Sequence, residues 1–262
     1  MNARMISGLL ALLALVLSAC TTVAPPPAAP VASADEALRA WATVLTRFVD
    51  ERGEVDFAAL AQDRGDLDRC LRYIADRPLD GFGSDAERLA HLINAYNTLS
   101  MFNVIASGIP ATHAGLNKVG FFILRKLQIG GRTMSLYAFE NEVIRPYTRA
   151  IGEPRVHFAL NCSARSCPVL PRQPFSAAGL DAELARESSA FFASAENFRV
   201  DHAARTVWLS EILSFYPEDF VPAHGSNLIA FANRYAQRTA PLDYAVRFTP
   251  YDWTVANSRR AR

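Results

Sequence analysis

The chain has 262 residues, of which 50% are hydrophobic, and 27 Lys and Arg against 26 Asp and Glu give a formal net charge of +1. This length suits one ordinary globular domain with short appendages. Because a nucleic-acid-binding surface must be strongly basic to release counterions from phosphates, the near-zero charge excludes that class, and we expect no nucleic acid among the partners.

The first 19 residues predict a signal peptide. Arg4 supplies a positive charge, and the apolar run from Ile6 to Leu17 is shorter than the ~20 residues that a membrane-spanning helix needs. The run ends in LSAC, where small residues precede Cys20 as in a lipobox. We therefore predict cleavage before Cys20 and its lipidation, which would anchor the chain to a bacterial membrane. An ordinary cleaved signal with a chance cysteine is the alternative.

The residues after Cys20 predict a location and a linker. Thr21 stands where some inner-membrane lipoproteins carry Asp, so we expect the periplasmic face of the outer membrane. The stretch TTVAPPPAAPVA has no apolar periodicity and predicts a semi-extended spacer. The expected segments are 1–19 (signal peptide), 20–32 (lipidated cysteine and linker), 33–256 (a single globular domain) and 257–262 (a polar, frayed tail).

Capping boxes and hydrophobic periodicity place the elements of the domain. We expect helices within 33–53, 57–74, 84–108, 135–145, 179–194 and 226–236. We expect strands in the hairpin arm 121–129, in 155–160, in the hairpin 199–209 and in 244–248. Runs of helix followed by antiparallel strands predict an α+β fold, a single domain of several helices packed on a small antiparallel sheet.

Polar side chains interrupt two apolar helical stretches. Asn94 and Asn97 lie in the long helix, which is apolar nearly all round and therefore buried. Since buried amides need partners, they either tie neighbouring backbone together or line a cleft. Glu140 lies on an apolar stripe, where a carboxylate must be paired or its pKa rises. It either forms a buried ion pair with Arg145 or Arg155, or serves a catalytic site.

The segment VHFALNCSARSCP, residues 156–168, carries the densest chemistry. A thiol beside His157 could form a nucleophilic thiolate–imidazolium pair. Five residues of extended chain span ~17 Å, so Cys162 meets His157 only if the chain turns back near Asn161. Exported proteins favour disulfides, so Cys162 and Cys167 could instead close a small loop, and simple packing is the third alternative.

Other chemistry receives little support from the sequence. The C-x4-C spacing is not that of thioredoxin-like redox sites, and no second ligand pair accompanies His157, so we expect neither metal nor cofactor. The segments 209–220 and 251–253 predict packing and capping, with Ser210 as a helix N-cap. The remaining histidines fall in predicted loops and receive no role: His113, His202 and His224.

Several of these segments together resemble the domain of unknown function 547 family. They are HLINAYN (91–97), Ser135-Leu136 with Glu140 and Arg145, EPRVHFALNC (153–162), SCP (166–168), and Leu209-Ser210 ahead of Asp219-Phe220. The resemblance covers roughly residues 55–253, and HFALNC-x4-CP is its distinctive part. The family's name leaves its activity unassigned.

The resemblance implies an α+β domain with kinship to papain-like or transglutaminase-like cysteine hydrolases. On that interpretation Cys162 is the nucleophile, with Cys167 as the alternative, His157 is its base, and Glu140 is the carboxylate that orients the base. The chain order differs from that of papain, and no cysteine opens a helix here. A triad is nevertheless defined by geometry and roles, not by order.

The sequence thus predicts a lipid-anchored periplasmic cysteine hydrolase or acyl transferase acting on an envelope peptide or amide. The residues expected to bind substrate are Asn94, Asn97, Asn161 and Arg165. Backbone N–H groups of the turn 161–166 would stabilise the oxyanion. The alternative is a non-catalytic binding module or pseudoenzyme, in which the same residues hold a peptide or protein partner and the cysteines are structural.

Overall fold

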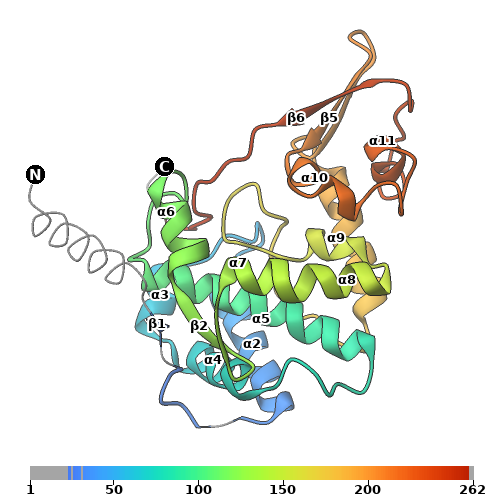
Figure 1. Cartoon of the computed structure of the whole chain (residues 1–262). Coiled ribbons are helices and arrows are strands. Elements are labelled where there is room, and N and C mark those ends of the chain that lie inside the picture. Colours follow the sequence, from blue (N-terminus) through green and yellow to red (C-terminus); the bar gives the residue numbers. More distant parts are fainter. Residues whose placement is uncertain (1–22, 25, 31, 260–262) are drawn as a thin grey trace, which may run out of the picture.

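The computed structural model describes residues 23–24, 26–30 and 32–259 (Figure 1). The predicted signal peptide and Cys20 lie outside these residues. Within the described part of the chain, no helix is long and apolar enough to cross a membrane.

Helices form most of the body. The α-helices are α2 (Ala34–Phe48), α3 (Phe57–Gln62), α4 (Gly65–Asp76), α5 (Asp85–Ala106), α6 (Leu116–Val119), α7 (Leu136–Ala138), α8 (Arg145–Ile151), α9 (Leu180–Ala193), α10 (Ile212–Phe215) and α11 (Leu228–Ala232). The π-helical stretches η1 (Gly120–Leu124) and η2 (Phe139–Ile144) continue α6 and α7, and η3 (Pro154–Phe158) and η4 (Pro217–Asp219) are 3-10 turns. The predicted capping residues Ser33 and Ser84 do begin α2 and α5.

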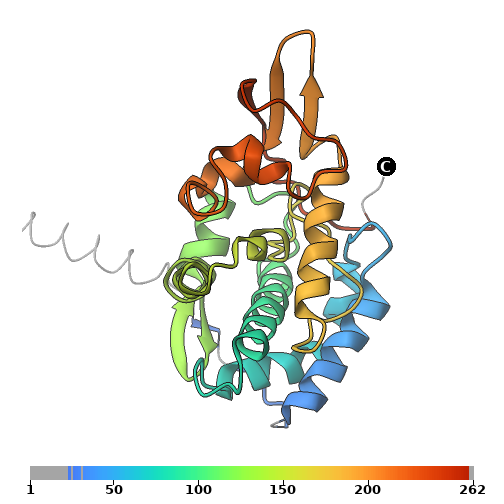
Figure 2. The same ribbon diagram turned by 90° about the vertical axis from the view of Figure 1, so that its right-hand side faces the viewer.

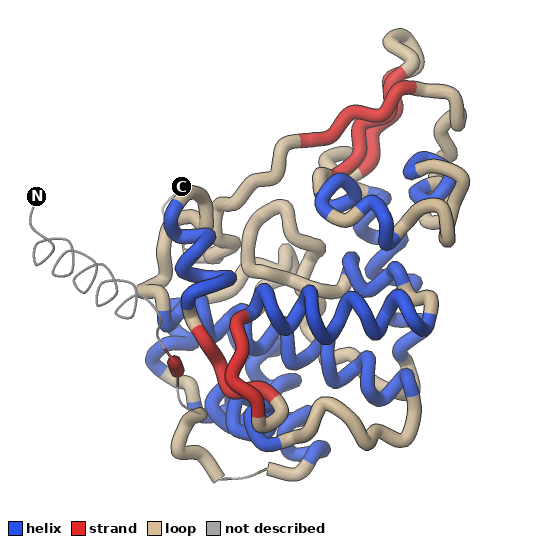
Figure 3. Tube along the Cα trace, viewed as in Figure 1, coloured by secondary structure: helices blue, strands red, loops and turns tan. Residues whose placement is uncertain are grey.

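Two small three-stranded sheets lie at separate places in the molecule (Figure 3). In the first, β2 (Lys126–Ile129) pairs antiparallel with β3 (Arg132–Ser135) and parallel with β1 (Val23–Ala24), which comes from the predicted linker. In the second, β5 (Thr206–Ser210) pairs antiparallel with β4 (Phe198–Asp201) and parallel with β6 (Ala245–Thr249). The α+β class is confirmed, with sheets that are mixed in direction.

The helical body and the C-terminal lobe have separate cores. In Figure 2, α5 runs through the middle of the body, with α8 on one side and α9 and α2 on the other. The main core surrounds α5, whereas a second, aromatic cluster around Phe158 joins α9 to the lobe built from β4–β6, α10 and α11. The lobe therefore packs on the body through Phe158, which directly follows His157 in the chain.

The strand predicted for residues 155–160 is wrong, because this segment forms the 3-10 turn η3. Pro154 occupies the first turn, and the Glu153 side chain accepts the Arg155 N–H at 3.2 Å, so local capping overrides the β-rich composition. Val156 and Phe158 are fully buried in different cores. Since a 3-10 turn rises only ~2 Å per residue, His157 lies much nearer the cysteines than an extended chain would allow.

Three other predicted elements differ in extent. The helix expected over 57–74 breaks at Asp63 and Arg64 into α3 and α4. The first half of the expected hairpin arm 121–129 is helical, and only β2 is extended. The expected helix over 226–236 reduces to α11, which Asn227 caps.

The last residues of the described chain hold the cysteine loop, residues 161–168, in place. Ala256 N–H donates to the Ser163 carbonyl at 2.8 Å, and Arg165 N–H donates to the Thr254 carbonyl at 2.9 Å. Asn257, which was expected to start a frayed tail, instead forms a bridge with Val55. That expectation is wrong for residues 257–259, because the edge of the α2–α3 connection offers them backbone partners.

Asn97 ties α5 to the cysteine loop. Its Nδ2 donates to the Ala159 carbonyl at 3.0 Å, and its Oδ1 accepts the Asn161 N–H at 2.8 Å, in surroundings that leave the side chain 2% exposed. The first alternative for this residue, a link between neighbouring backbones, is what the structure shows. Asn94 does the same for Phe175, with both backbone groups bound at 2.8 and 3.0 Å.

We expect Asn97→Ala to lower the free energy of unfolding by about 3 kcal/mol, because two buried backbone groups lose their partners. Chemical denaturation at neutral pH measures this loss. Asn117→Ala is the matched control, since this exposed side chain makes one bond to the Thr112 carbonyl and should change stability by less than about 0.5 kcal/mol. Equal effects of the two variants would contradict the structural role given to Asn97.

Candidate functional site

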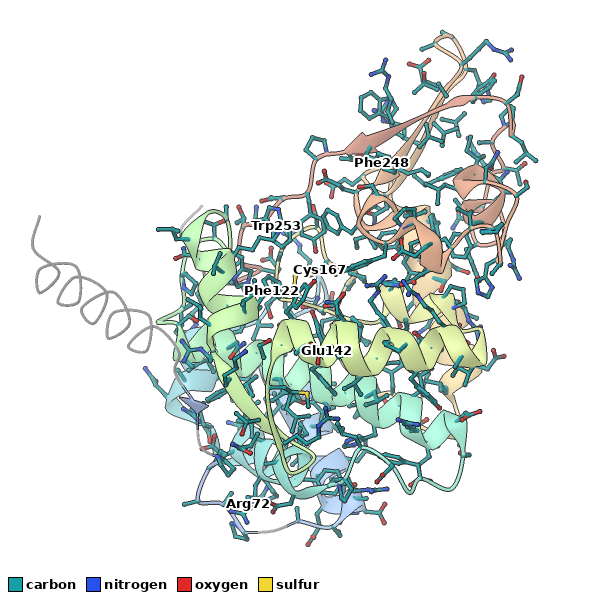
Figure 4. The ribbon with its side chains drawn as sticks, viewed as in Figure 1. Arg72, Phe122, Glu142, Cys167, Phe248 and Trp253 are labelled. Atoms are coloured by element: carbon teal, nitrogen blue, oxygen red, sulfur yellow. The ribbon has the colours of Figure 1, made fainter. Side chains whose placement is uncertain are left out.

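A cleft of about 400 Å³ opens between the helical body and the C-terminal lobe. Its lining includes Tyr96, Lys118, Val119, Phe122, Ile123, Tyr137, Glu140, His157, Leu160, Cys162, Cys167, Pro168, Ile212, Phe215, Tyr216, Tyr251 and Trp253. Figure 4 shows Cys167, Phe122 and Trp253 gathered at this junction, whereas Arg72 lies at the far end of the body. The fold thus brings His157, Glu140, Cys162 and Cys167, four of the predicted site residues, to one cavity.

The two cysteines lie in direct contact as free thiols. Their sulfur atoms are 2.8 Å apart, and Cys167 Sγ also accepts the Cys162 backbone N–H at 3.0 Å. The Tyr251 hydroxyl lies 3.0 Å from Cys167 Sγ and 3.6 Å from Cys162 Sγ. Asn161 holds the loop closed, since its side chain binds the Pro168 carbonyl and the Ser163 N–H at 2.8 and 2.7 Å.

The surroundings of the two sulfurs push their pKa values apart. Burial alone would raise the pKa of the Cys167 thiol, but hydrogen bonds from the Cys162 thiol, the Tyr251 hydroxyl and backbone N–H groups outweigh it and lower the pKa. The hydrogen bond to Cys167 and burial raise the pKa of the Cys162 thiol well above its usual value. Cys167 is therefore the sulfur better suited to carry a negative charge, with Cys162 as the thiol that donates to it.

The imidazole of His157 is held in a fixed orientation. Its Nε2 lies 2.8 Å from Asp219 Oδ2, and its ring packs against Tyr216 and Phe220 at centroid distances of 5.5 and 5.0 Å. Because an ionised carboxylate can only accept, Nε2 carries the proton in this contact. Nδ1 makes no hydrogen bond within the described part of the chain, so it is the nitrogen available for proton transfer in the cleft.

Asp219 is a buried charge with several partners. Its carboxylate accepts from Arg145 Nε at 2.7 Å and also from Arg149 Nε, while only 6% of the residue is exposed. Burial alone would raise the pKa of this carboxyl, but the hydrogen bonds from His157, Arg145 and Arg149 hold the pKa well below its usual range. Segment 209–220 was predicted only to pack and to cap, so Asp219 was missed as a site residue, although it belongs to one of the segments that carry the family resemblance.

Glu140 has a different partner from those expected. The Tyr96 hydroxyl donates to its Oε2 at 2.7 Å, and burial raises the pKa of the Glu140 carboxyl. The predicted ion pair is wrong, because Arg145 binds Asp219 and Glu218 whereas Arg155 binds Glu153 and Asp181. The carboxylate in contact with His157 is Asp219.

The residues predicted to bind substrate do not line this cleft. The side-chain amides of Asn94, Asn97 and Asn161 bind backbone groups. The Arg165 guanidinium lies 3.5 Å from the Glu54 carboxylate, and Arg165 lines a separate cavity of about 110 Å³.

Most backbone N–H groups of the turn 161–166 already have acceptors, and the N–H of Ala164 points to the sulfurs of Cys162 and Cys167. The other N–H groups with acceptors are those of Asn161, Cys162, Ser163, Arg165 and Ser166. Sequence reasoning missed Tyr251 and Tyr96, whose hydroxyl groups serve as donors in the cleft.

The described residues contain no group of three or more His, Cys, Asp or Glu side chains that could hold a metal ion.

We expect Asp219→Asn to lower the free energy of unfolding by about 3 kcal/mol at pH 7, because Arg145 loses a buried ionic partner. The folded-state pKa of Asp219 lies below the unfolded value of ~3.9, so its stabilisation is present above that pH and is lost as pH falls towards the folded value. The difference between wild type and variant should therefore shrink below about pH 4, as measured by denaturation from pH 2 to 8.

Glu140→Gln is the control, and it should show the opposite sign. The folded-state pKa of Glu140 is raised, so the wild-type protein loses stability as pH rises from the unfolded value of ~4.3 through the folded value. A glutamine has no such loss, and the variant should become relatively more stable across that window. Parallel pH profiles for all three proteins would refute both assignments of charge.

One comparison with known proteins gives a match that covers part of this site. No curated protein and no solved structure matches the chain. Residues 81–192 match a family model described as "Protein of unknown function, DUF547". The matched stretch includes Glu140, His157, Cys162 and Cys167, whereas Asp219 and Tyr251 lie beyond it. The segment that supplies the thiols and the imidazole of the cleft is thus a match to the DUF547 domain family, whose function is unknown.

Proposed function

We propose that this protein is a cysteine-type acyl-transfer enzyme, a hydrolase or acyl transferase. The observation that carries the proposal is that a carboxylate-held imidazole and a pair of free thiols line the same cleft. Thiol, imidazole and an orienting carboxylate are the groups that nucleophilic catalysis on a carbonyl requires.

In the proposed triad Cys167 is the nucleophile, His157 is the base and Asp219 orients the base. Cys167 is preferred over Cys162 because its sulfur accepts three hydrogen bonds, from the Cys162 N–H, the Cys162 thiol and the Tyr251 hydroxyl. Each of these donors stabilises the thiolate. Asp219 takes the place of Glu140 as the orienting group because, in the described part of the chain, it is the carboxylate that accepts from His157.

The reaction runs in two steps. The Cys167 thiolate attacks the carbonyl carbon, the bond to the leaving group breaks, and the His157 Nδ1–H gives its proton to that group. A water or a second nucleophile then attacks the thioester, His157 Nδ1 takes its proton, and the Cys167 sulfur leaves. The Tyr251 hydroxyl lies 3.0 Å from the reacting sulfur, and burial raises its pKa, so it keeps its proton and can stabilise the oxyanion.

We expect mass-spectrometric mapping of iodoacetamide labelling from pH 5 to 9 to show that Cys167 reacts with a midpoint well below the ~8.5 of a free thiol. His157→Gln should raise that midpoint by about 1 unit or more, because the imidazolium no longer stabilises the thiolate. Cys167→Ser should leave Cys162 reactive only at higher pH.

Cys70 is the internal control for this labelling. It is buried against the Ala37 carbonyl, and burial raises its pKa to about 12, so it should label only when the protein unfolds. Fast labelling of Cys162 in place of Cys167 would move the nucleophile by five residues. If both cleft cysteines resist labelling until they are reduced, they form a disulfide and the acyl-transfer proposal fails in favour of a binding module.

The enzyme is proposed to work on the periplasmic face of the outer membrane, anchored by lipid at Cys20. The support is the order of a charged start, an apolar run and small residues before Cys20. Metabolic labelling with a radioactive fatty acid should label the wild-type protein and Cys70→Ala, and it should not label Cys20→Ala. A wild-type protein without the label would contradict the lipid anchor.

A further inference from the structure

The walls of the cleft are apolar far beyond what catalysis needs. One wall comes from the α6–η1 segment, with Val119, Phe122 and Ile123, and the facing wall carries Ile212 and Phe215 of the C-terminal lobe. Figure 4 shows Phe122 and Trp253 side by side at this opening, where their ring centroids are 6.2 Å apart. An apolar concave surface with a few polar groups at one place is typical of a small-molecule or side-chain site.

The rim of the cleft exposes large apolar side chains to water. Val119 is 40% exposed, Phe215 39%, Ile123 45% and Tyr137 49%. All four line the cleft, so their exposed area lies around one opening. Because such clustered exposure is unfavourable in water and gains nothing for the fold, it is best explained by a ligand that covers it.

Charge is nearly absent from the lining. Apart from His157 and the thiols, Lys118 and Glu140 are the lining residues that bear an ionisable acid or amine. Glu140 lies at the inner end, has no cationic partner within salt-bridge distance in the described chain, and accepts from Tyr96. Lys118 Nζ lies 3.8 Å from the ring centroid of Trp253 at the rim. A cationic ligand would therefore meet Lys118 at the entrance, and the Asp219 carboxylate is already in contact with Arg145, Arg149 and His157.

The size of the cleft limits what can fill it. A volume of about 400 Å³ corresponds to roughly a dozen water-sized groups, since one water occupies ~30 Å³ in the liquid. This matches a medium-length fatty acyl group or an arylalkyl side chain, and it is too small for an extended polar peptide to enter whole.

Resting on the acyl-transfer function proposed above, we propose that the cleft selects an acyl donor with an uncharged aliphatic or aromatic body of about a dozen non-hydrogen atoms, and that Val119, Ile123 and Phe215 are the residues that determine this specificity. The donor's carbonyl lies at Cys167 and its apolar body lies against these walls. Charged envelope peptides are excluded as donors on this ground.

The test compares p-nitrophenyl esters of one chain length that differ in charge: hexanoate, 6-aminohexanoate and the adipate monoester. In each case the ester bond breaks, a thioester forms at Cys167, and p-nitrophenolate is released and measured, with Cys167→Ser as the blank. We expect kcat/KM for the hexanoate to exceed that for the 6-aminohexanoate by at least tenfold and that for the adipate by a smaller factor. The 3-phenylpropanoate should react about as well as the hexanoate.

Ile123→Asp tests the wall directly, and Leu116→Asp is its matched control. Leu116 is 90% exposed in the same helical segment but does not line the cleft. We expect Ile123→Asp to lower kcat/KM for the hexanoate about tenfold. The ratio of kcat/KM for the hexanoate to that for the 6-aminohexanoate should fall, or drop below one. Leu116→Asp should leave both this ratio and the pH profile of Cys167 labelling unchanged.

The outcomes separate the two proposals. If the charged esters acylate Cys167 as fast as the hexanoate, or if Ile123→Asp and Leu116→Asp behave alike, the substrate class is overturned while acyl transfer stands. If none of the esters yields an adduct at Cys167 or Cys162, acyl transfer itself is overturned, and the substrate class falls with it.

Discussion

The site depends on a single buried carboxylate that is kept ionised. Asp219 would be unstable as a charge at 6% exposure without partners, and it obtains them from three directions: His157 of η3, Arg145 at the start of α8 and Arg149 one turn later. Because Asp219 belongs to the C-terminal lobe and the other three belong to the body, the same interaction that docks the lobe also orients the imidazole. Stability and site geometry therefore cannot be varied independently at this position.

A second constraint acts on the thiols. The cysteine loop has contacts on three sides, with Asn97 of α5 beneath it, Asn161 closing it from within, and the segment 252–256 bound along its edge. This arrangement gives most backbone N–H groups of the turn an acceptor, and it directs the Ala164 N–H at the sulfurs. The Tyr251 hydroxyl also reaches the sulfurs, from a distant part of the chain.

Helix caps were read correctly from the sequence, whereas the long-range contacts of the site were not. Ser33 and Ser84 predicted helix starts because a cap acts within four residues. The strand expected at 155–160 does not form. Its apolar residues Val156 and Phe158 face two different cores, and such a segment has the same apolar composition as a buried strand. His157, Glu140, Cys162 and Cys167 were identified from residue type and family resemblance. Asp219 lies 62 residues from His157, and nothing in the sequence pairs a particular carboxylate with a particular imidazole across such a distance.

The contacts of residues 252–256 with the cysteine loop have a consequence for the order in which the site forms. Residues 252–256 hold the cysteine loop and Tyr251 completes the environment of the sulfurs, yet Tyr251 follows Cys167 by 84 residues in the chain. Until these residues are synthesised, the loop lacks the backbone partners along its edge and the sulfurs lack the Tyr251 hydroxyl. The thiol pair therefore reaches its final surroundings late, and a chain cut before Tyr251 would keep both cysteines but lose contacts that fix their geometry.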